Sequence, residues 1–254
     1  MKAERLRAGF WRRAISLFLD AMIVFIPLQI AAAVLFALTS GHIQFAGGGI
    51  NTTVCYKATG IPNDLNPPPP KNFNVAQVCK TFVFGAETAR RLTVARVTKD
   101  GNATYRISES YSLDRNDQVI NAWGLEWPAY LVMLAYLIAL KLRKGGTLGD
   151  RATKISVVDD SLKTNLPPPL KQMTIRYTVL LGPFIVTAAI MLILARTIGT
   201  TAEDMAKYHY IAAAFVLMAP ALIYYVIALV RIVRKTDPFW DRAALTAVIR
   251  SVRP

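Results

Sequence analysis

The sequence predicts a mainly α-helical membrane protein, in which a bundle of four transmembrane helices carries a small β-rich extracytoplasmic insertion. Three observations lead to this prediction. The chain contains four long apolar stretches, its basic residues are concentrated between them, and its only two cysteines lie in one long connecting segment. With 254 residues, 54% of them hydrophobic, the chain has room for one membrane domain and one insertion.

Each apolar stretch is long enough to cross the bilayer, which takes roughly 20 mostly apolar residues. The first stretch is longer than the apolar core of a signal peptide and contains Asp20. We therefore interpret residues 1–38 as a cytoplasmic N-terminus followed by a retained helix. The four predicted spans are residues 14–38, 123–142, 177–195 and 208–230.

The basic residues predict the orientation of the chain. Lys and Arg number five before the first span, eight in residues 141–176 and six in residues 231–254, but only two in residues 196–207. Cytoplasmic segments are enriched in Lys and Arg, whereas long loops translocate whatever their charge. We therefore expect both termini, including the amphipathic tail 231–254, and the loop 143–176 to be cytoplasmic. The loops 39–122 and 196–207 are expected on the other side.

The overall charge also bears on the partners. Lys and Arg exceed Asp and Glu by 30 to 16, which fits a bilayer with anionic headgroups. Nucleic acid is not expected as a partner, because no basic stripe interleaved with aromatic residues is present.

The loop 39–122 is interpreted as an inserted domain. Residues 91–97 alternate between polar and apolar side chains, and residues 104–113 follow the turn-forming residues 99–102. This pattern predicts a β-hairpin.

The two cysteines, Cys55 and Cys79, both lie in this loop. They predict a disulfide that closes a loop of about 25 residues, although two free buried thiols are the alternative. A disulfide requires an oxidising compartment, such as a bacterial periplasm. The expected location is therefore a bacterial inner (plasma) membrane, with the loop in the periplasm.

Asp20 is the one acidic residue well inside an apolar stretch. It follows Arg13 by seven residues, so the two lie on the same helix face. A carboxylate at a helix centre costs on the order of 2.5–3.5 kcal/mol on the insertion scale, and usually faces the bundle interior or a cavity. Two interpretations stay open. Asp20 is either a proton or cation site, or a structural partner of Arg13, Arg176 or a nearby backbone group.

The cytoplasmic segments contain two further motifs. Residues 145–151 read GGTLGDR and are followed by alternating residues 154–158. We expect a tight turn that leads into a short strand at the membrane surface, and the alternative is an anion-binding nest around Thr147. Residues 240–248 suit a segment that lies along the headgroups.

Taken together, these segments resemble the RDD family of membrane proteins, named for one Arg and two Asp. Arg13 and Asp20 match the Arg and the first Asp of the family's opening helix. Asp150 stands where the family's Gly-x-Thr-x-Gly-Lys-Arg turn usually has Lys. The residues that match this turn are Gly146, Thr147, Gly149 and Arg151.

The third matching motif runs from Trp240 to Val248, so Asp241 would be the second Asp. Trp240 replaces the usual His, which puts in doubt any proton-handling role assigned to that His. Arg176 also fits the family pattern. The resemblance covers all four spans and omits the outer loop.

The resemblance implies two functions. Some members are proposed to be cation/proton antiporters, and others look like accessory subunits of membrane complexes. In a monovalent cation/proton transporter, Asp20 would bind the ion while Arg13 and Asp241 control its access. In a scaffold, the same residues would lock the helices together, and the outer loop would bind a membrane protein or a second copy of the chain.

Enzyme chemistry is not expected. No nucleophile elbow, phosphate loop or dinucleotide-binding motif is present, so no catalytic residue and no cofactor is predicted. The only histidines, His42 and His209, are far apart in the sequence, and no metal site is expected.

Overall fold

The computed structural model describes residues 6–47, 51–62, 64–101, 103–161, 166–198 and 208–250. The chain forms two compact units. The first comprises Met1–Val24, Leu131–Leu192 and Ala213–Pro254, and the second comprises Phe25–Tyr130 and Ile193–Ala212. Most of the predicted short loop 196–207 lies outside the described residues, as do the basic residues Lys2, Arg5 and Lys207.

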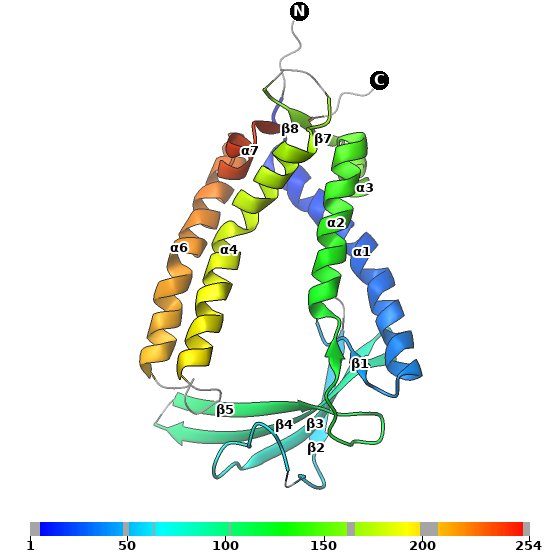
Figure 1. Ribbon diagram of the computed structural model, residues 1–254, viewed down its shortest axis with the longest axis vertical. Helices are drawn as coiled ribbons and strands as arrows, with labels where there is room; N and C mark the ends of the chain where they lie inside the picture. Colours follow the sequence, from blue (N-terminus) through cyan, green and yellow to red (C-terminus); the bar gives the residue numbers. More distant parts are fainter. Residues whose placement is uncertain are drawn as a thin grey trace, which may run out of the picture. The chain divides into compact units, whose positions relative to one another are not determined.

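Three helices in the described part of the chain are long and apolar enough to cross a membrane (Figure 1). They are α1 (Phe10–Leu38), α4 (Leu170–Ile198) and α6 (Tyr208–Val233). Each begins earlier or ends later than the predicted span, because a helix continues past the hydrocarbon region. Arg176, expected in the loop 143–176, therefore lies inside α4.

The remaining predicted span corresponds to α2 (Glu126–Lys144), which has 19 residues. Every 18-residue stretch of α2 contains Lys141, Arg143 and one further charged residue, so α2 does not qualify by composition. The fold is thus a mixture of apolar helices and β-sheet, in which three helices qualify as spans rather than the expected four.

Helices α4 and α6 run side by side (Figure 1), and hydrogen bonds connect them. Pro183 has no N–H group, so the carbonyl of Val179, four residues earlier, loses its helical partner. The hydroxyl of Tyr224 in α6 donates a hydrogen bond to that carbonyl at 2.9 Å. Tyr225 makes a similar bond to Leu180 at 2.7 Å. The neighbouring helix therefore satisfies the acceptor that the proline frees.

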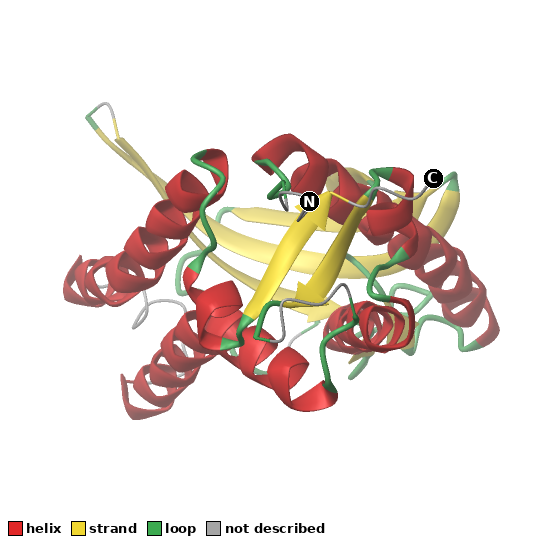
Figure 2. Ribbon diagram, turned by 90° about the horizontal axis from the view of Figure 1, so that it is seen from above, coloured by secondary structure: helices red, strands yellow, loops and turns green. Residues whose placement is uncertain are grey.

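Two short strands lie beside each other in the first unit (Figure 2). β7 (Ile155–Asp159) pairs with β8 (Thr246–Arg250) in an antiparallel register. The predicted short strand after the glycine-rich motif is confirmed, but a five-residue helix, α3 (Leu148–Ala152), takes the place of the expected turn. A second short helix, α7 (Phe239–Ala243), precedes β8.

The C-terminal tail differs from the prediction. Residues 240–248 were expected along the headgroups, but residues 246–248 are at most 4% exposed. Their apolar side chains pack instead with β7 and the helices. The cluster includes Val248, Val157 and Met173.

The second unit contains a four-stranded antiparallel sheet in the order β2-β3-β4-β5. The long β4–β5 pair confirms the predicted hairpin, which turns between Asp100 and Ala103. The strands are β2 (Thr52–Lys57), β3 (Val75–Val83), β4 (Ala86–Asp100) and β5 (Ala103–Ser112). Two further short strands, β1 (Ile43–Gln44) and β6 (Trp123–Gly124), pair in parallel, before and after the four strands of the sheet in the sequence.

The disulfide between Cys55 and Cys79 is present, as predicted. The two residues are direct partners in the β2–β3 register, and their Cα atoms are 4.0 Å apart. The bond therefore fastens the edge strand β2 to the rest of the sheet.

Arg90 holds the loop after β5. Its guanidinium bonds to Glu87 at 2.7 Å, to Asp117 at 2.9 Å and to the carbonyl of Arg115 at 2.7 Å. The bonds to Glu87 and Asp117 raise the pKa of Arg90, although burial opposes them. Arg90 is thus a fixed cation that closes the end of the sheet.

Candidate functional site

The site lies in the first unit, and its centre is the carboxylate of Asp20 in α1. Asp20 is 1% exposed and accepts three hydrogen bonds. The hydroxyl of Tyr136 and the amide of Gly149 each donate to Oδ1 at 2.8 Å, and the hydroxyl of Thr147 donates to Oδ2 at 2.5 Å. Hydrogen bonds to a charged group contribute roughly 1.5–3 kcal/mol each. Asp20 therefore joins α1, α2 and the start of α3.

The start of α3 is rigid because a capping box closes it. Thr147 is the N-cap residue, and its hydroxyl accepts a hydrogen bond from the amide of Asp150 at 3.1 Å. In return, the carboxylate of Asp150 accepts from the amide of Thr147 at 3.1 Å. A reciprocal pair of this kind satisfies two amides at the helix start. A lysine in place of Asp150 would have no acceptor to complete the box.

Gly149 allows α3 to lie directly against α1. A Cβ atom at this position would lie 2.9 Å from the carboxyl carbon of Asp20 and would overlap the carbonyl oxygen of Ser16. Any other residue would move α3 away from α1. The glycine is therefore required by close approach and not by its φ angle.

Asp150 has a second function besides capping. Its carboxylate accepts a hydrogen bond from Ser16 at 2.6 Å, and Lys141 of α2 lies 3.6 Å away. Burial alone would raise the pKa of Asp150. Lys141 and the hydrogen bonds from Ser16 and Thr147 outweigh burial and hold that pKa below its ordinary value. Asp150 is thus ionised and links α1 to α2.

A second charged cluster surrounds Asp241 of α7, which is fully buried. Arg13 of α1 lies 3.1 Å from one carboxylate oxygen, and Arg176 of α4 lies 3.0 Å from the other. Arg13 also donates to the carbonyl of Ala8 at 3.1 Å. This cluster joins α1, α4 and α7, three elements far apart in the sequence.

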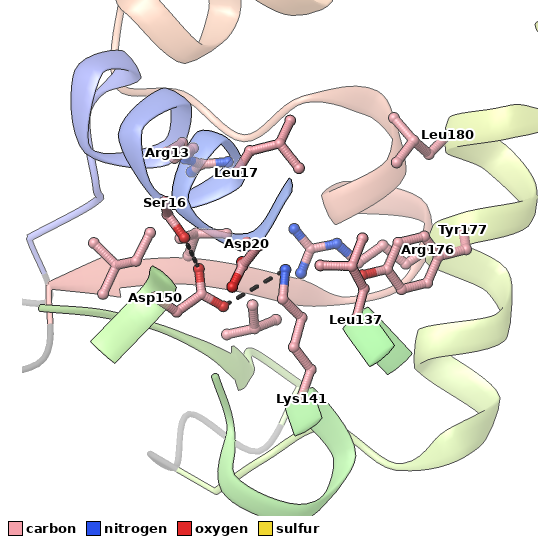
Figure 3. Close-up of a pocket in the computed structure, with 13 residues that line it drawn as sticks. Arg13, Ser16, Leu17, Asp20, Leu137, Lys141, Asp150, Arg176, Tyr177 and Leu180 are labelled. Atoms are coloured by element: carbon pink, nitrogen blue, oxygen red, sulfur yellow. Dashed lines mark hydrogen bonds and ion pairs between the residues drawn. The ribbon is translucent and has the colours of Figure 1, made fainter. Parts of the chain in front are cut away.

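A cavity of about 130 Å³ lies between these two clusters (Figure 3). Its charged lining consists of Arg13, Asp20, Lys141, Asp150 and Arg176, and its apolar lining includes Leu17, Leu137 and Leu180. Within the part of the chain that the structure describes, no group of three or more His, Cys, Asp and Glu residues is placed to hold a metal ion.

The sequence model of the RDD family matches residues 81–244. The chain belongs to the RDD family. Since three helices among the described residues are long and apolar enough to cross a membrane, it is an integral membrane protein. Comparisons with curated proteins and with solved structures give no significant match.

The matched range differs from the expected one. It begins within β3 and ends after α7, so it includes part of the inserted segment and excludes α1. Arg13 and Asp20 therefore lie outside the match. The structure nevertheless brings both next to RDD motif residues inside it, Thr147, Gly149 and Asp241.

The partners of the RDD residues match the expectation in part. Asp20 was expected to pair with Arg13, Arg176 or a nearby backbone group. The backbone alternative is confirmed by the Gly149 amide, and the other described partners of Asp20 are two hydroxyls. Both arginines contact Asp241 instead. Arg151 has an exposed side chain and does not line the cavity.

Three residues of the site were missed from the sequence. Ser16 lies one helical turn before Asp20, so the shared face was visible in the spacing. Lys141 was counted only as a cytoplasmic charge. Nothing in the sequence indicated a role for Tyr136, because a tyrosine within an apolar stretch is common. Their roles depend on the packing of α1, α2 and α3.

Proposed function

We propose that this RDD protein is a four-span scaffold or accessory subunit of a membrane complex, located in a bacterial inner membrane. In this proposal α2 is the fourth transmembrane span, in addition to α1, α4 and α6. Its middle, residues 127–140, contains no charged residue, and its charges lie at the two ends, where they reach the headgroups.

The observation that supports a scaffold is the pairing of every carboxylate in the site with a donor from the protein. Asp20 accepts an amide and two hydroxyls, and Asp241 accepts two arginines. A cation site instead needs oxygen atoms directed at an open position. The Gly149 amide, which contacts Asp20 directly, cannot serve as a cation ligand. The network is therefore suited to hold α1, α2, α4 and α7 together.

The orientation in this proposal follows from charge and redox chemistry. The excess of basic residues in both termini and in the segment 143–176 favours a cytoplasmic position for them. The Cys55–Cys79 bond fits an oxidising periplasm for the second unit's sheet. The partner, a membrane protein or a second copy, would bind through this sheet. Its edge strand β2 is exposed along its whole length, including Val54 and Tyr56.

The test is co-purification of the full-length protein after cross-linking, compared with a chain in which residues 51–112 are replaced by a short Gly-Ser linker. We expect the replacement to abolish a specific cross-linked partner while the shortened protein still inserts in the membrane. A second test variant, Val54→Lys, keeps the sheet but adds a charge to its edge strand. It should weaken the same cross-link. Unchanged cross-linking in both variants would contradict the scaffold.

One observation favours a second candidate, a monovalent cation/proton transporter: the cavity reaches Asp20. Here Asp20 would exchange its protein donors for the ion during transport. Purified protein in proteoliposomes would then carry out Na⁺-, K⁺- or H⁺-dependent flux that Asp20→Asn abolishes. A lack of flux by the wild type under all three gradients excludes this candidate.

A further inference from the structure

The cavity between the two charged clusters is lined by a buried hydrogen-bond donor that has no acceptor among the described residues. Arg176 is 7% exposed, and its Nη1 has no hydrogen-bond partner among the described residues. Lys141 is 3.6 Å from Asp150, longer than a hydrogen bond, so its ammonium group is only loosely paired. In Figure 3 both cationic groups point toward the middle of the cavity.

The carboxylates of the cavity do not compensate for these donors. Asp20 is already bonded to Tyr136, Thr147 and Gly149. Asp150 is bonded to Ser16 and to the amide of Thr147. None of their oxygen atoms accepts a hydrogen bond from Nη1 of Arg176, so this donor is left without an acceptor among the described residues. A buried N–H group without an acceptor is costly, and a ligand or water normally supplies one.

From the unpartnered Nη1 of Arg176 and the loosely paired ammonium group of Lys141, we infer that the cavity is a binding site for a phosphate group, held by these two residues. Phosphate offers several acceptor oxygens, and Arg and Lys are its usual protein partners. The volume of about 130 Å³ corresponds to about four water molecules, enough for one small oxyanion. This inference does not depend on whether the protein is a scaffold or a transporter.

Two sources present the same phosphate chemistry, a phospholipid headgroup and free inorganic phosphate. The walls of the cavity come from α1, α2 and α4, and they include the apolar side chains of Leu17, Leu137 and Leu180. Basic pockets between membrane helices are typical sites for anionic headgroups. A lipid would place its phosphate against the cations and the first carbons of its acyl chains against these leucines.

The experiment uses full-length protein purified in detergent, and compares wild type with Lys141→Gln, Lys141→Arg and Lys171→Gln. Lys171 is exposed near the start of α4, does not line the cavity, and provides the matched control. Native mass spectrometry measures retention of added phosphatidylglycerol, with phosphatidylcholine for comparison. Thermal unfolding measures the shift caused by inorganic phosphate, with chloride at equal ionic strength for comparison.

We expect wild type, Lys141→Arg and Lys171→Gln to bind one phosphate-bearing ligand, and Lys141→Gln to bind it about 10- to 100-fold more weakly, as for the loss of one charge-assisted hydrogen bond. Selective retention of phosphatidylglycerol identifies a lipid site. A phosphate-induced shift without lipid retention identifies a free-anion site. If wild type shows neither response, or if Lys141→Gln folds and binds as well as Lys171→Gln does, the inference is wrong. The wild-type measurements decide the question even if Lys141→Gln does not fold.

Discussion

Replacing Gly149 by alanine perturbs the contact between α3 and α1 without changing any charge. The added Cβ would lie 2.9 Å from the carboxyl carbon of Asp20 and overlap the carbonyl oxygen of Ser16. Both obstacles belong to the body of α1, so α3 has to move. Overpacking of this kind costs about 1–3 kcal/mol.

The movement also weakens the bonds from Gly149 and Thr147 to Asp20, which are 2.8 and 2.5 Å long. Each contributes roughly 1.5–3 kcal/mol, so we expect a total loss of about 3–5 kcal/mol, allowing for partial relaxation. At about 2–4 °C per kcal/mol for a chain of this size, Tm should fall by roughly 10 °C.

The assay is thermal unfolding of the purified protein in detergent, followed by circular dichroism. Gly182→Ala is the matched control, because the same methyl group in α4 meets nothing within 4 Å. It should leave Tm unchanged or raise it slightly, since alanine favours a helix over glycine. Equal Tm values for the Gly149→Ala variant and the wild type would refute the close contact between α3 and Asp20.

Three further predictions concern the second unit and the charges. Replacing Cys55 and Cys79 by serine should lower the free energy of unfolding of the sheet by about 3 kcal/mol, measured by urea titration with proteolysis as the readout, and adding reductant to this variant should change nothing further. Asp241→Ala removes the only carboxylate that pairs with both Arg13 and the buried Arg176 among the described residues, and it should destabilise the first unit by about 3–5 kcal/mol, whereas a substitution at exposed Lys171 should have little effect on Tm. Asp150 has a lowered pKa in the folded state. The stability it contributes is therefore present above its unfolded pKa of 3.8 and is lost as the pH falls below that value. Asp150→Asn should flatten this part of the acid unfolding curve, and an unchanged curve would contradict the assignment.

Much of the fold could be predicted because local patterns carry it. The apolar stretches predict α1, α4 and α6 since crossing a bilayer requires a minimum length. The alternation before and after the residues 99–102 predicts the β4–β5 hairpin, and confinement of both cysteines to one loop predicts the disulfide. The strands β2 and β3 were missed, because polar and proline-rich residues surround them and their alternation is weak.

The site could be predicted only in part, because its geometry depends on segments far apart in the sequence. Helical spacing correctly places Arg13 and Asp20 on one face. It cannot show that α7 lies close to Arg13, so only the family resemblance grouped Arg13 with Asp241, and the direct contact between them comes from the structure. The pairing of β7 with β8 could not be predicted for the same reason, because these two strands are also far apart in the sequence. An apolar tail with flanking arginines is typical both of a surface segment and of a buried strand, and only the position of β7 decides between them.

The carboxylate of Asp20 holds the start of α3 against α1 through the hydrogen bonds from Thr147 and Gly149. A double-mutant cycle with Asp20→Asn and Thr147→Val measures this directly, because the two side chains share a hydrogen bond and the valine has nearly the same shape as threonine. We predict a coupling free energy of about 1–3 kcal/mol in thermal or denaturant unfolding, the range for contacting residues in one network. Additive effects of the two substitutions, with a coupling near zero, would contradict the claim.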